Sequence, residues 1–349
     1  MIIVLVIICL SILILIHELG HFLTAKFFGI EVEEFGIGFP PQLWSKKMGG
    51  TIYSVNALPF GGFVKIHGED GESQGEKVQN SFSGKSFLEK SGVLLAGVFM
   101  NLVLGWLVLS FVLMAGAPEH LILTDVAPNS PAEAAGLQPG DIILRASFSN
   151  ADLADPVKSG DLIDLVKSAG ASPVNLKIGR SGEVLDVDIA GRVNPPEGQG
   201  SLGVALSEIG FKPTPFFESF WAGLKETWQI IVLVTAGFWS LLTKIFIEPK
   251  IVQTITGPVG IFGLAEQAGS VGLIYLFQLM ALISINLAVL NLIPFPALDG
   301  GRFLMLIVEK LKGSPISRKI QIAVNLVGFS ALILLMIVVT IQDVHKLIK

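Results

Sequence analysis

Four long apolar stretches constrain the fold of this chain more than any other feature. They cover residues 2–28, 92–117, 272–293 and 320–341, and each is long enough to cross a lipid bilayer as an α-helix. Charged residues make up only 15% of the chain, whereas a soluble domain carries about 25%. The sequence therefore predicts a polytopic α-helical membrane protein with about four transmembrane helices.

The first apolar stretch differs from a secretory signal peptide. No Lys or Arg precedes it, and the apolar run continues into a polar motif at residue 17 without a small-residue cleavage site. We therefore expect residues 1–28 to be retained as transmembrane helix 1. The other expected spans are 92–117, 272–301 and 320–342.

Two polar regions lie between the first three spans. Residues 29–91 are rich in glycine and have β patterns at 32–37, 51–56 and 62–66, which predicts a small membrane-associated β segment. Residues 118–207 predict an inserted soluble α+β domain. Its expected strands are 121–126, 142–146, 174–178, 184–189 and 202–206, and its expected helices are 131–135 and 160–168.

The strongest local motif is His17-Glu18-Leu19-Gly20-His21, near the end of the first span. Residues four apart lie on one face of a helix, so the two imidazoles can hold one Zn²⁺ ion beside Glu18, the candidate general base. The pattern also occurs by chance. Within a membrane span, however, ionisable residues are costly and are functional by default. The motif therefore predicts a catalytic zinc site.

A catalytic zinc site uses three protein ligands, so a third ligand is needed from elsewhere in the chain. The best candidate is Asp299, which follows the third apolar span after a break at Pro294 and Pro296. Asp-Gly is also a common turn pair, so Asp299 by itself is equally consistent with a turn residue.

Membrane topology favours Asp299 as a ligand. We expect the region after the third span, 302–319, to be a short loop. Like 29–91 it is rich in Lys and Arg, which places both in the cytoplasm. The first and third spans then run in the same direction. The histidine pair and Asp299 both come late in these spans, so they are expected at the same depth near the cytoplasmic side.

A fifth apolar stretch, 230–247, is shorter and contains Lys244. If it crossed the membrane, the third span would reverse and Asp299 would lie on the opposite side from the histidines. We therefore expect 208–271 to be an interfacial or re-entrant helical segment. Trp221, Trp228 and Trp239 suit such a position.

Candidate substrate contacts lie close to both metal motifs. Asn286 and Asn291 precede Asp299, and asparagine is costly in hydrocarbon unless it is paired. Either could bind the substrate backbone or an oxyanion, or could join two helices instead. A helical substrate must unwind before cleavage, and an extended peptide can pair with a strand edge. The candidate edge, 62–66, contains Gly62, Phe63 and Val64, although an ordinary hairpin strand is the plainer interpretation.

Composition excludes other classes of protein. The formal net charge is −5 and no basic cluster is present, which argues against a nucleic-acid partner. The only cysteine, Cys9, excludes an internal disulfide and a cysteine-based zinc site.

The two metal motifs together resemble those of the site-2 protease family of intramembrane zinc metalloproteases. That family has H-E-x-x-H in an early span and N-x-x-P-x-x-x-L-D-G in a later one, here beginning at His17 and Asn291. The order of parts is most similar to the regulator-of-sigma-E protease branch. Further similarities lie at 35–40, 61–66 and 256–261, so the resemblance covers almost the whole chain.

The resemblance implies roles for particular residues. His17, His21 and Asp299 would be zinc ligands, Glu18 the catalytic base, and Asn291 a residue near the active site. It also implies cleavage of single-span membrane proteins, such as anti-sigma factors and remnant signal peptides. Such cleavage would follow trimming by an upstream site-1-type protease, in a bacterial inner membrane with the inserted domain outside.

The inserted domain resembles a PDZ domain. Residues 130–143 carry this similarity, and 200–204 correspond to a carboxylate-binding loop in a circularly permuted order. Well-known members of the branch have two PDZ domains in tandem, whereas 118–207 have room for one. A single domain puts the substrate-size filter of the tandem in doubt, and the domain could bind a peptide C-terminus or only block access.

Two other classes of function remain as alternatives. A non-catalytic PDZ-bearing scaffold with a structural metal would leave Glu18 without a purpose, because a structural zinc site closes with a fourth ligand. An ion or proton transporter would use the same ionisable residues, but the sequence has no evident inverted repeat. A zinc-dependent intramembrane metalloendopeptidase accounts for all of these features.

Overall fold

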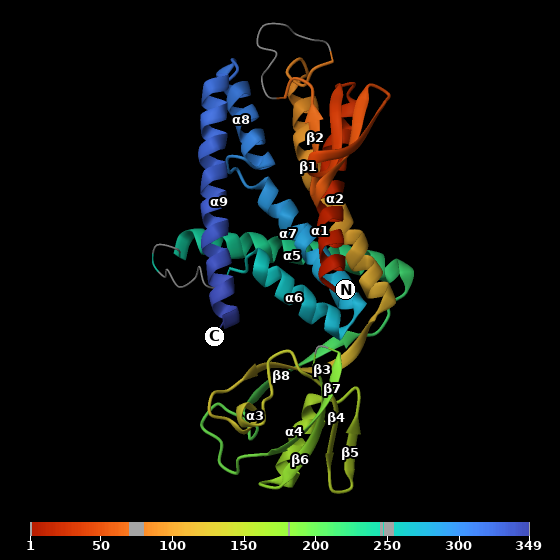
Figure 1. Cartoon of the computed structure of the whole chain (residues 1–349), viewed down its shortest axis with the longest axis vertical. Helices are drawn as coiled ribbons and strands as arrows, with labels where there is room; N and C mark the ends of the chain where they lie inside the picture. The colour runs from red at the N-terminus through yellow and green to blue at the C-terminus, as the bar shows by residue number, and fades with distance from the viewer. Residues whose placement is uncertain (1, 70–79, 181, 245–246, 248–254, 349) are drawn as a thin grey trace. The chain divides into compact units, whose positions relative to one another are not determined.

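A computed structural model describes residues 2–69, 80–180, 182–244, 247 and 255–348 of the 349-residue chain. The chain divides into two compact units (Figure 1). Unit 1 contains residues 1–110, 220–265 and 277–349, and unit 2 contains residues 111–219 and 266–276.

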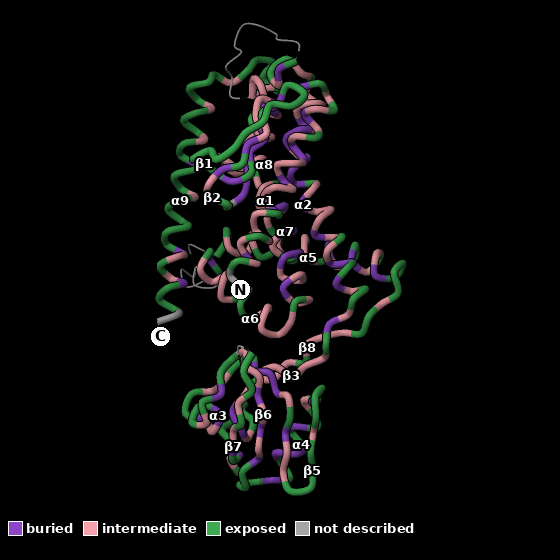
Figure 2. Tube along the Cα trace, turned by 45° about the vertical axis from the view of Figure 1, so that its right-hand side comes forward, coloured by how far each residue is buried: buried purple, intermediate pink, exposed green. Residues whose placement is uncertain are grey.

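Among the described residues, four helices are long and apolar enough to cross a membrane, as the sequence predicts. They are α1 (Ile2–Phe27), α2 (Phe87–Ala115), α7 (Leu273–Leu292) and α9 (Arg318–Ile348). Many of their large apolar side chains are exposed, and Figure 2 shows that α9 is exposed along most of its length. Such exposure is expected where lipid covers the helix.

Small residues bring α1, α2 and α7 close together. A Cβ atom on Gly20 of α1 would lie 2.5 Å from the carbonyl oxygen of Ala96 on α2. A Cβ atom on Gly105 of α2 would lie 2.5 Å from the Ile285 side chain on α7. Glycine therefore allows contacts between these helices that a larger residue would block.

The β segment of unit 1 consists of two long strands, β1 (Val32–Met48) and β2 (Thr51–Ile66), where the sequence predicted three short ones. Residues 34–37 of β1 pair with both 62–65 and 52–55 of β2, and the register shifts repeatedly. Glycines with positive φ, including Gly38 and Gly61, bend the strands without ending them. The Gly and Pro residues that predict strand ends in the sequence therefore mark bends in the structure.

Strand β2 lies along the transmembrane helix α1. The Ser11 hydroxyl of α1 donates to the carbonyl oxygen of Pro59, and the position of a Cβ on Gly61 would be 3.0 Å from Ile14. These α1 residues lie in the middle of the candidate span. Part of β2 therefore lies at the depth of the span, where irregular backbone is tolerated only against protein or water.

Helix α5 (Phe216–Lys244) is absent from the candidate spans found in the described residues, and α6 (Pro258–Val271) follows it. Figure 1 shows α5 running across the direction of α9. Trp221, Trp228 and Trp239 are each more than 60% exposed on α5. This orientation is compatible with the predicted interfacial or re-entrant segment.

One predicted loop is instead a helix. Residues 302–319 were expected to be a loop, but α8 (Asp299–Lys312) occupies most of this segment and ends at Gly313, whose φ is 74°. The expected third span, 272–301, is therefore divided: α7 ends at Leu292, and Asp299 is the first residue of α8. The Lys and Arg residues of this segment predict on which side of the membrane it lies. They do not indicate that it forms a short amphipathic helix.

Unit 2 is a β-rich domain that agrees with the predicted α+β pattern. Its strands are β3 (Ala117–Val126), β4 (Ile142–Phe148), β5 (Ala151–Ala154), β6 (Pro173–Arg180), β7 (Glu183–Ala190) and β8 (Val204–Phe211), and its helices are α3 (Pro131–Ala134) and α4 (Ser159–Ala169). The sheet order is β7-β6-β4-β3-β8, with β5 paired to β4. Strand β5 was not predicted, and β8 extends past residue 207 to pair Phe211 with Ala117.

Candidate metal centre

Helix α1 places His17 and His21 on one face, one turn apart. Their Nε2 atoms lie 3.2 Å apart, and both side chains are buried. The Nδ1 atom of His21 lies 2.8 Å from the carbonyl oxygen of Val93 on α2. A carbonyl only accepts hydrogen bonds, so Nδ1 of His21 carries the proton and its Nε2 presents a lone pair.

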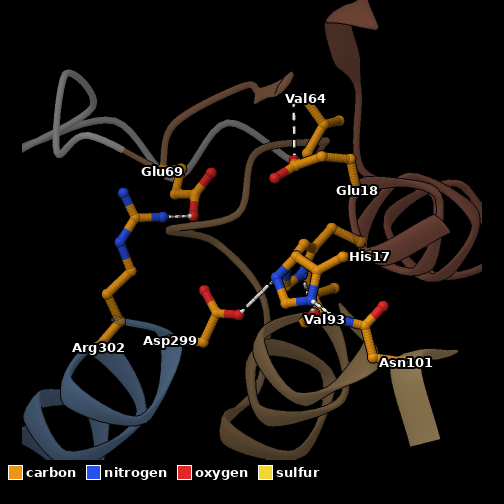
Figure 3. A network of polar contacts seen from close by, with 9 residues as sticks. His17, Glu18, Val64, Glu69, Val93, Asn101, Asp299 and Arg302 are labelled. Carbon is orange, nitrogen blue, oxygen red and sulfur yellow. Dashed lines mark hydrogen bonds and ion pairs between the residues drawn. The ribbon is translucent and has the colours of Figure 1, made fainter. Parts of the chain in front are cut away.

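Asp299 brings a third ligand atom to this pair (Figure 3). Its Oδ2 lies 3.0 Å from His17 Nε2 and 3.4 Å from His21 Nε2. Zinc ligands about 2.0–2.1 Å from a tetrahedral ion are about 3.3 Å from one another. The three atoms therefore have the separations that one zinc ion requires, and the residues form a group able to hold a metal.

The chemistry of the three atoms also fits a cation. Asp299 Oδ2 is buried and accepts no hydrogen bond within the described part of the chain. A carboxylate oxygen and imidazole lone pairs repel one another at these distances unless a cation or proton lies among them. The orphaned Asp299 oxygen and the His21 tautomer thus both favour a bound metal ion.

Glu18 lies beside the ligands but points toward the β segment (Figure 3). Its Oε2 accepts a hydrogen bond from the backbone N–H of Val64 at 3.1 Å. Val64 belongs to β2, so the strand that contains the predicted substrate edge is bonded directly to the candidate base. The sequence placed Gly62, Phe63 and Val64 in a substrate role without predicting this bond.

The break between α7 and α8 holds Asp299 in place. Ala297 has a φ of 72°, which is strained for a residue with a side chain, and its N–H donates to Asn325 Oδ1 of α9 at 3.4 Å. A Cβ on Gly328 of α9 would lie 2.4 Å from Cβ of Pro296. Helix α9 therefore forms the support against which the Pro-containing loop packs.

Close backbone packing explains why glycine follows Asp299 at two successive positions. A Cβ on Gly300 would lie 2.3 Å from the carbonyl oxygens of Leu292 and Ile293, and one on Gly301 would lie 2.1 Å from that of Phe295. Side chains at either position would push the start of α8 away from the end of α7. The Asp-Gly-Gly sequence is thus required by the tight packing of this break.

An ion pair beside the metal ligands was not predicted. Arg302 Nη1 of α8 lies 2.5 Å from Glu69 Oε1, which follows β2 (Figure 3). Arg302 is three residues after Asp299, so this pair links the end of the β segment to the helix that carries the third ligand. No sequence motif indicates such a long-range pair.

The side chains of the two predicted asparagines, Asn286 and Asn291, have no hydrogen-bond partner among the described residues. Asn286 is exposed on α7, and Asn291 is half-buried near the end of the same helix. The structure therefore gives no support to a helix–helix hydrogen bond for either residue. Both remain predictions as substrate contacts.

Two of the three other described histidines lie next to carboxylates. His67 Nδ1 lies 2.9 Å from Glu33 Oε1, and His120 Nδ1 lies 3.0 Å from Asp155 Oδ1. Hydrogen bonds from Lys65 and His67 hold the pKa of Glu33 below its usual range. These pairs lie outside the metal ligand group.

The sequence profile of Peptidase family M50 matches residues 5–335. A candidate zinc metalloprotease of Clostridium perfringens is 37% identical over 334 residues, which cover 96% of each chain. The zinc metalloprotease RasP of Shouchella clausii is 29% identical, covering 97% of each chain. The regulator of sigma-W protease RasP of Bacillus subtilis is 27% identical, covering 96% of each chain.

Proposed function

The chain belongs to peptidase family M50, and on that premise we propose that it cleaves single-span membrane proteins within or next to their transmembrane segments. The protein is a zinc-dependent metalloendopeptidase. Its four candidate spans make it an integral membrane protein. The proposal therefore concerns where it cuts, which substrates it takes and which residues act.

The observation that carries the proposal is the position of the metal ligands. His17 and His21 belong to the candidate span Val4–Phe27, and Asp299 follows the candidate span Leu273–Leu292 after a short break. A site built on these helices can be reached only by a peptide bond that is itself in or beside the bilayer. A soluble peptide, which does not lie in or beside the bilayer, would not have comparable access to a site at this depth.

Glu18 acts as the general base in the proposed reaction. Zinc, when bound, polarises the scissile carbonyl and makes water acidic enough to attack at neutral pH. Glu18 takes the proton from the attacking water and later gives it to the leaving amine. Its bond to Val64 keeps the carboxylate beside β2, so the base is oriented toward the strand that would hold the substrate.

The substrate would bind in an extended conformation along β2. Residues 62–66 pair with β1 on one edge, and no other described strand pairs with the opposite edge. That edge can offer backbone groups of Gly62, Phe63 and Val64 to an unwound substrate, although the N–H of Val64 is already bonded to Glu18. Asn291, which is half-buried on α7, would bind the substrate backbone or the oxyanion. Asn286, which is exposed on the same helix, would contact the substrate as it approaches the metal centre.

Unit 2 would act as a PDZ-like domain. Strand β8 forms an edge of the sheet and follows the 200–204 loop, and α4 is tied to it by hydrogen bonds from Ser159 to Glu208. An edge strand beside a helix suits peptide addition or exclusion. We place this domain outside a bacterial inner membrane and the metal centre near the cytoplasmic side.

The relatives suggest the substrate class. One of them is named as a regulator of sigma-W protease, so anti-sigma-factor-like proteins and remnant signal peptides are the substrates we propose. An upstream site-1-type protease would trim them first. The lipid bilayer is the remaining partner, and a nucleic-acid partner is not proposed.

Reconstitution with a generic single-span substrate tests the proposal. Wild type and Glu18→Gln are compared in liposomes, with zinc measured by elemental analysis, because glutamine keeps the shape of Glu18 but cannot act as a base. Cleavage by wild type and none by the zinc-loaded variant would support the proposal. Equal cleavage by both would overturn the role of Glu18, and no cleavage by either would favour the scaffold alternative.

A further inference from the structure

Helix α2 contributes none of the three candidate metal ligands, but it packs directly against both histidines of the site. A Cβ on Gly97 would lie 2.4 Å from His21 Nε2 and 2.7 Å from His17 Nε2. Asn101 follows one turn later and is only 1% exposed. Its backbone carbonyl accepts a hydrogen bond from the Ser284 hydroxyl of α7 at 2.8 Å, which braces this part of α2.

The side chain of Asn101 reaches the back of the His17 ring (Figure 3). Asn101 Nδ2 lies 3.3 Å from His17 Nδ1, while Asn101 Oδ1 is buried and has no partner among the described residues. With this amide orientation, His17 Nδ1 would accept a hydrogen bond and Nε2 would carry the proton. A protonated Nε2 cannot bind a metal ion.

Metal binding requires the opposite arrangement. If His17 Nε2 is a ligand, the proton of the neutral ring is on Nδ1, and this N–H needs an acceptor. A half-turn of the Asn101 amide exchanges its oxygen and nitrogen, and such orientations are assigned from the hydrogen-bond network. It brings Oδ1, the atom left without a donor, onto His17 Nδ1.

We propose that Asn101 is a positioning residue for the metal centre, whose Oδ1 accepts the Nδ1–H of His17 and so holds Nε2 toward the metal. The inference rests on the metal site of the proposed function and deepens it. The two histidines are then oriented by the same helix: His21 by the Val93 carbonyl and His17 by the Asn101 side chain. Only the second acceptor can be removed by a side-chain substitution.

The test compares zinc affinity in Asn101→Leu and Asn101→Asp, measured by competition with a chromogenic chelator on purified full-length protein. Leucine fills similar space without an acceptor, and loss of such an outer partner costs about 10- to 100-fold in metal affinity. Aspartate keeps the acceptor, so its zinc affinity should equal or exceed that of wild type. If leucine prevents folding, Asn101→Ala replaces it with the same expected loss.

Comparing the zinc affinities of Asn101→Asp and Asn101→Leu distinguishes a positioning role of Asn101 from a packing role. A purely structural role predicts that aspartate, a charge buried between helices, is more harmful than leucine. Zinc binding by Asn101→Leu that equals wild type, or weaker binding by Asn101→Asp than by Asn101→Leu, would overturn the inference. Ser110→Ala is the matched control, because Ser110 is also buried on α2 and bonds to the Trp106 carbonyl of its own helix.

Zinc affinity is measured without cleavage, so the two proposals can fail separately. Wild type that binds zinc but cleaves no membrane substrate would count against the proposed function and leave Asn101 in its role. Wild type that cleaves, with unchanged zinc affinity in Asn101→Leu, would count against the role of Asn101 alone.

Discussion

The backbone N–H of Val64 donates a hydrogen bond to Glu18 Oε2 across 3.1 Å. This bond joins a strand of the β segment to the candidate base on transmembrane helix α1. In the proposed reaction, a peptide that pairs with β2 would be held in register with Glu18. This one backbone hydrogen bond would then couple the position of the substrate to the position of the proposed base.

Removing that donor should slow cleavage without removing the metal. Val64→Pro lacks the N–H, and hydrogen bonds to a charged group contribute about 1.5–3 kcal/mol. We expect cleavage to fall about 10- to 100-fold with full zinc occupancy. Val64→Ala keeps the N–H and is the control in the same cleavage and metal assays. Equal activity of the two variants would show that the bond does not orient Glu18.

A side chain at Gly97 should displace the metal ligands. The Cβ of Gly97→Ala would occupy space within 2.4–2.7 Å of both imidazole rings, although alanine favours the helix itself. We expect zinc to be lost while α2 stays folded, as measured by elemental analysis and circular dichroism. Gly105→Ala is the control, because its Cβ would press on Ile285 of α7 and on no metal ligand, so it disturbs helix packing but should keep its zinc. Normal zinc content in Gly97→Ala would contradict the close approach of α2.

The packing of α9 against the loop before Asp299 can be tested by a substitution on α9. A Cβ at Gly328 would lie 2.6 Å from the carbonyl oxygen of Pro296, so Gly328→Ala should shift the loop and weaken zinc binding about tenfold or more. Chelator competition measures this change. Gly237→Ala on α5, where a Cβ meets nothing within 4 Å, should bind zinc as wild type does.

In unit 2, one ion pair should matter more for stability than another. Asp141 is buried and receives two hydrogen bonds from Arg180, at 2.6 and 2.7 Å, which raise the pKa of that guanidinium. Arg180→Met leaves the carboxylate without its cation and should cost about 3 kcal/mol. Arg145→Met breaks the exposed pair with Asp152 and should have no measurable effect. Thermal proteolysis of unit 2 in the full chain compares the two.

The membrane position of α5 can be measured through its tryptophans. Trp221 and Trp239 are 18 residues apart, so a crossing helix would separate them by about 27 Å in depth. An interfacial α5 would hold Trp221, Trp228 and Trp239 at one shallow depth. Single-tryptophan variants in liposomes with brominated lipids report the depth of each residue. Shallow quenching of the two end residues with deep quenching of Trp228 would indicate a re-entrant helix.

Several features could be predicted from the sequence because they depend on local periodicity. The apolar lengths determined four candidate spans, and the spacing of His17 and His21 placed them on one face of a helix. Asp299 could be proposed as a partner from topology and from the family resemblance, but topology sets the depth of a residue and not its distance from another. The prediction of a loop at 302–319 was wrong, because the Lys and Arg residues of this segment indicate its side of the membrane but not its secondary structure.

The tertiary structure decided which atoms meet. The separations among His17, His21 and Asp299, the contact of Asn101 with His17 and the bond from Val64 to Glu18 all join segments distant in the sequence. The long strands β1 and β2 likewise depend on their pairing, because Gly and Pro can either bend or end a strand. Local sequence determines the face of a helix on which a side chain lies, whereas the packing of distant segments determines what that side chain touches.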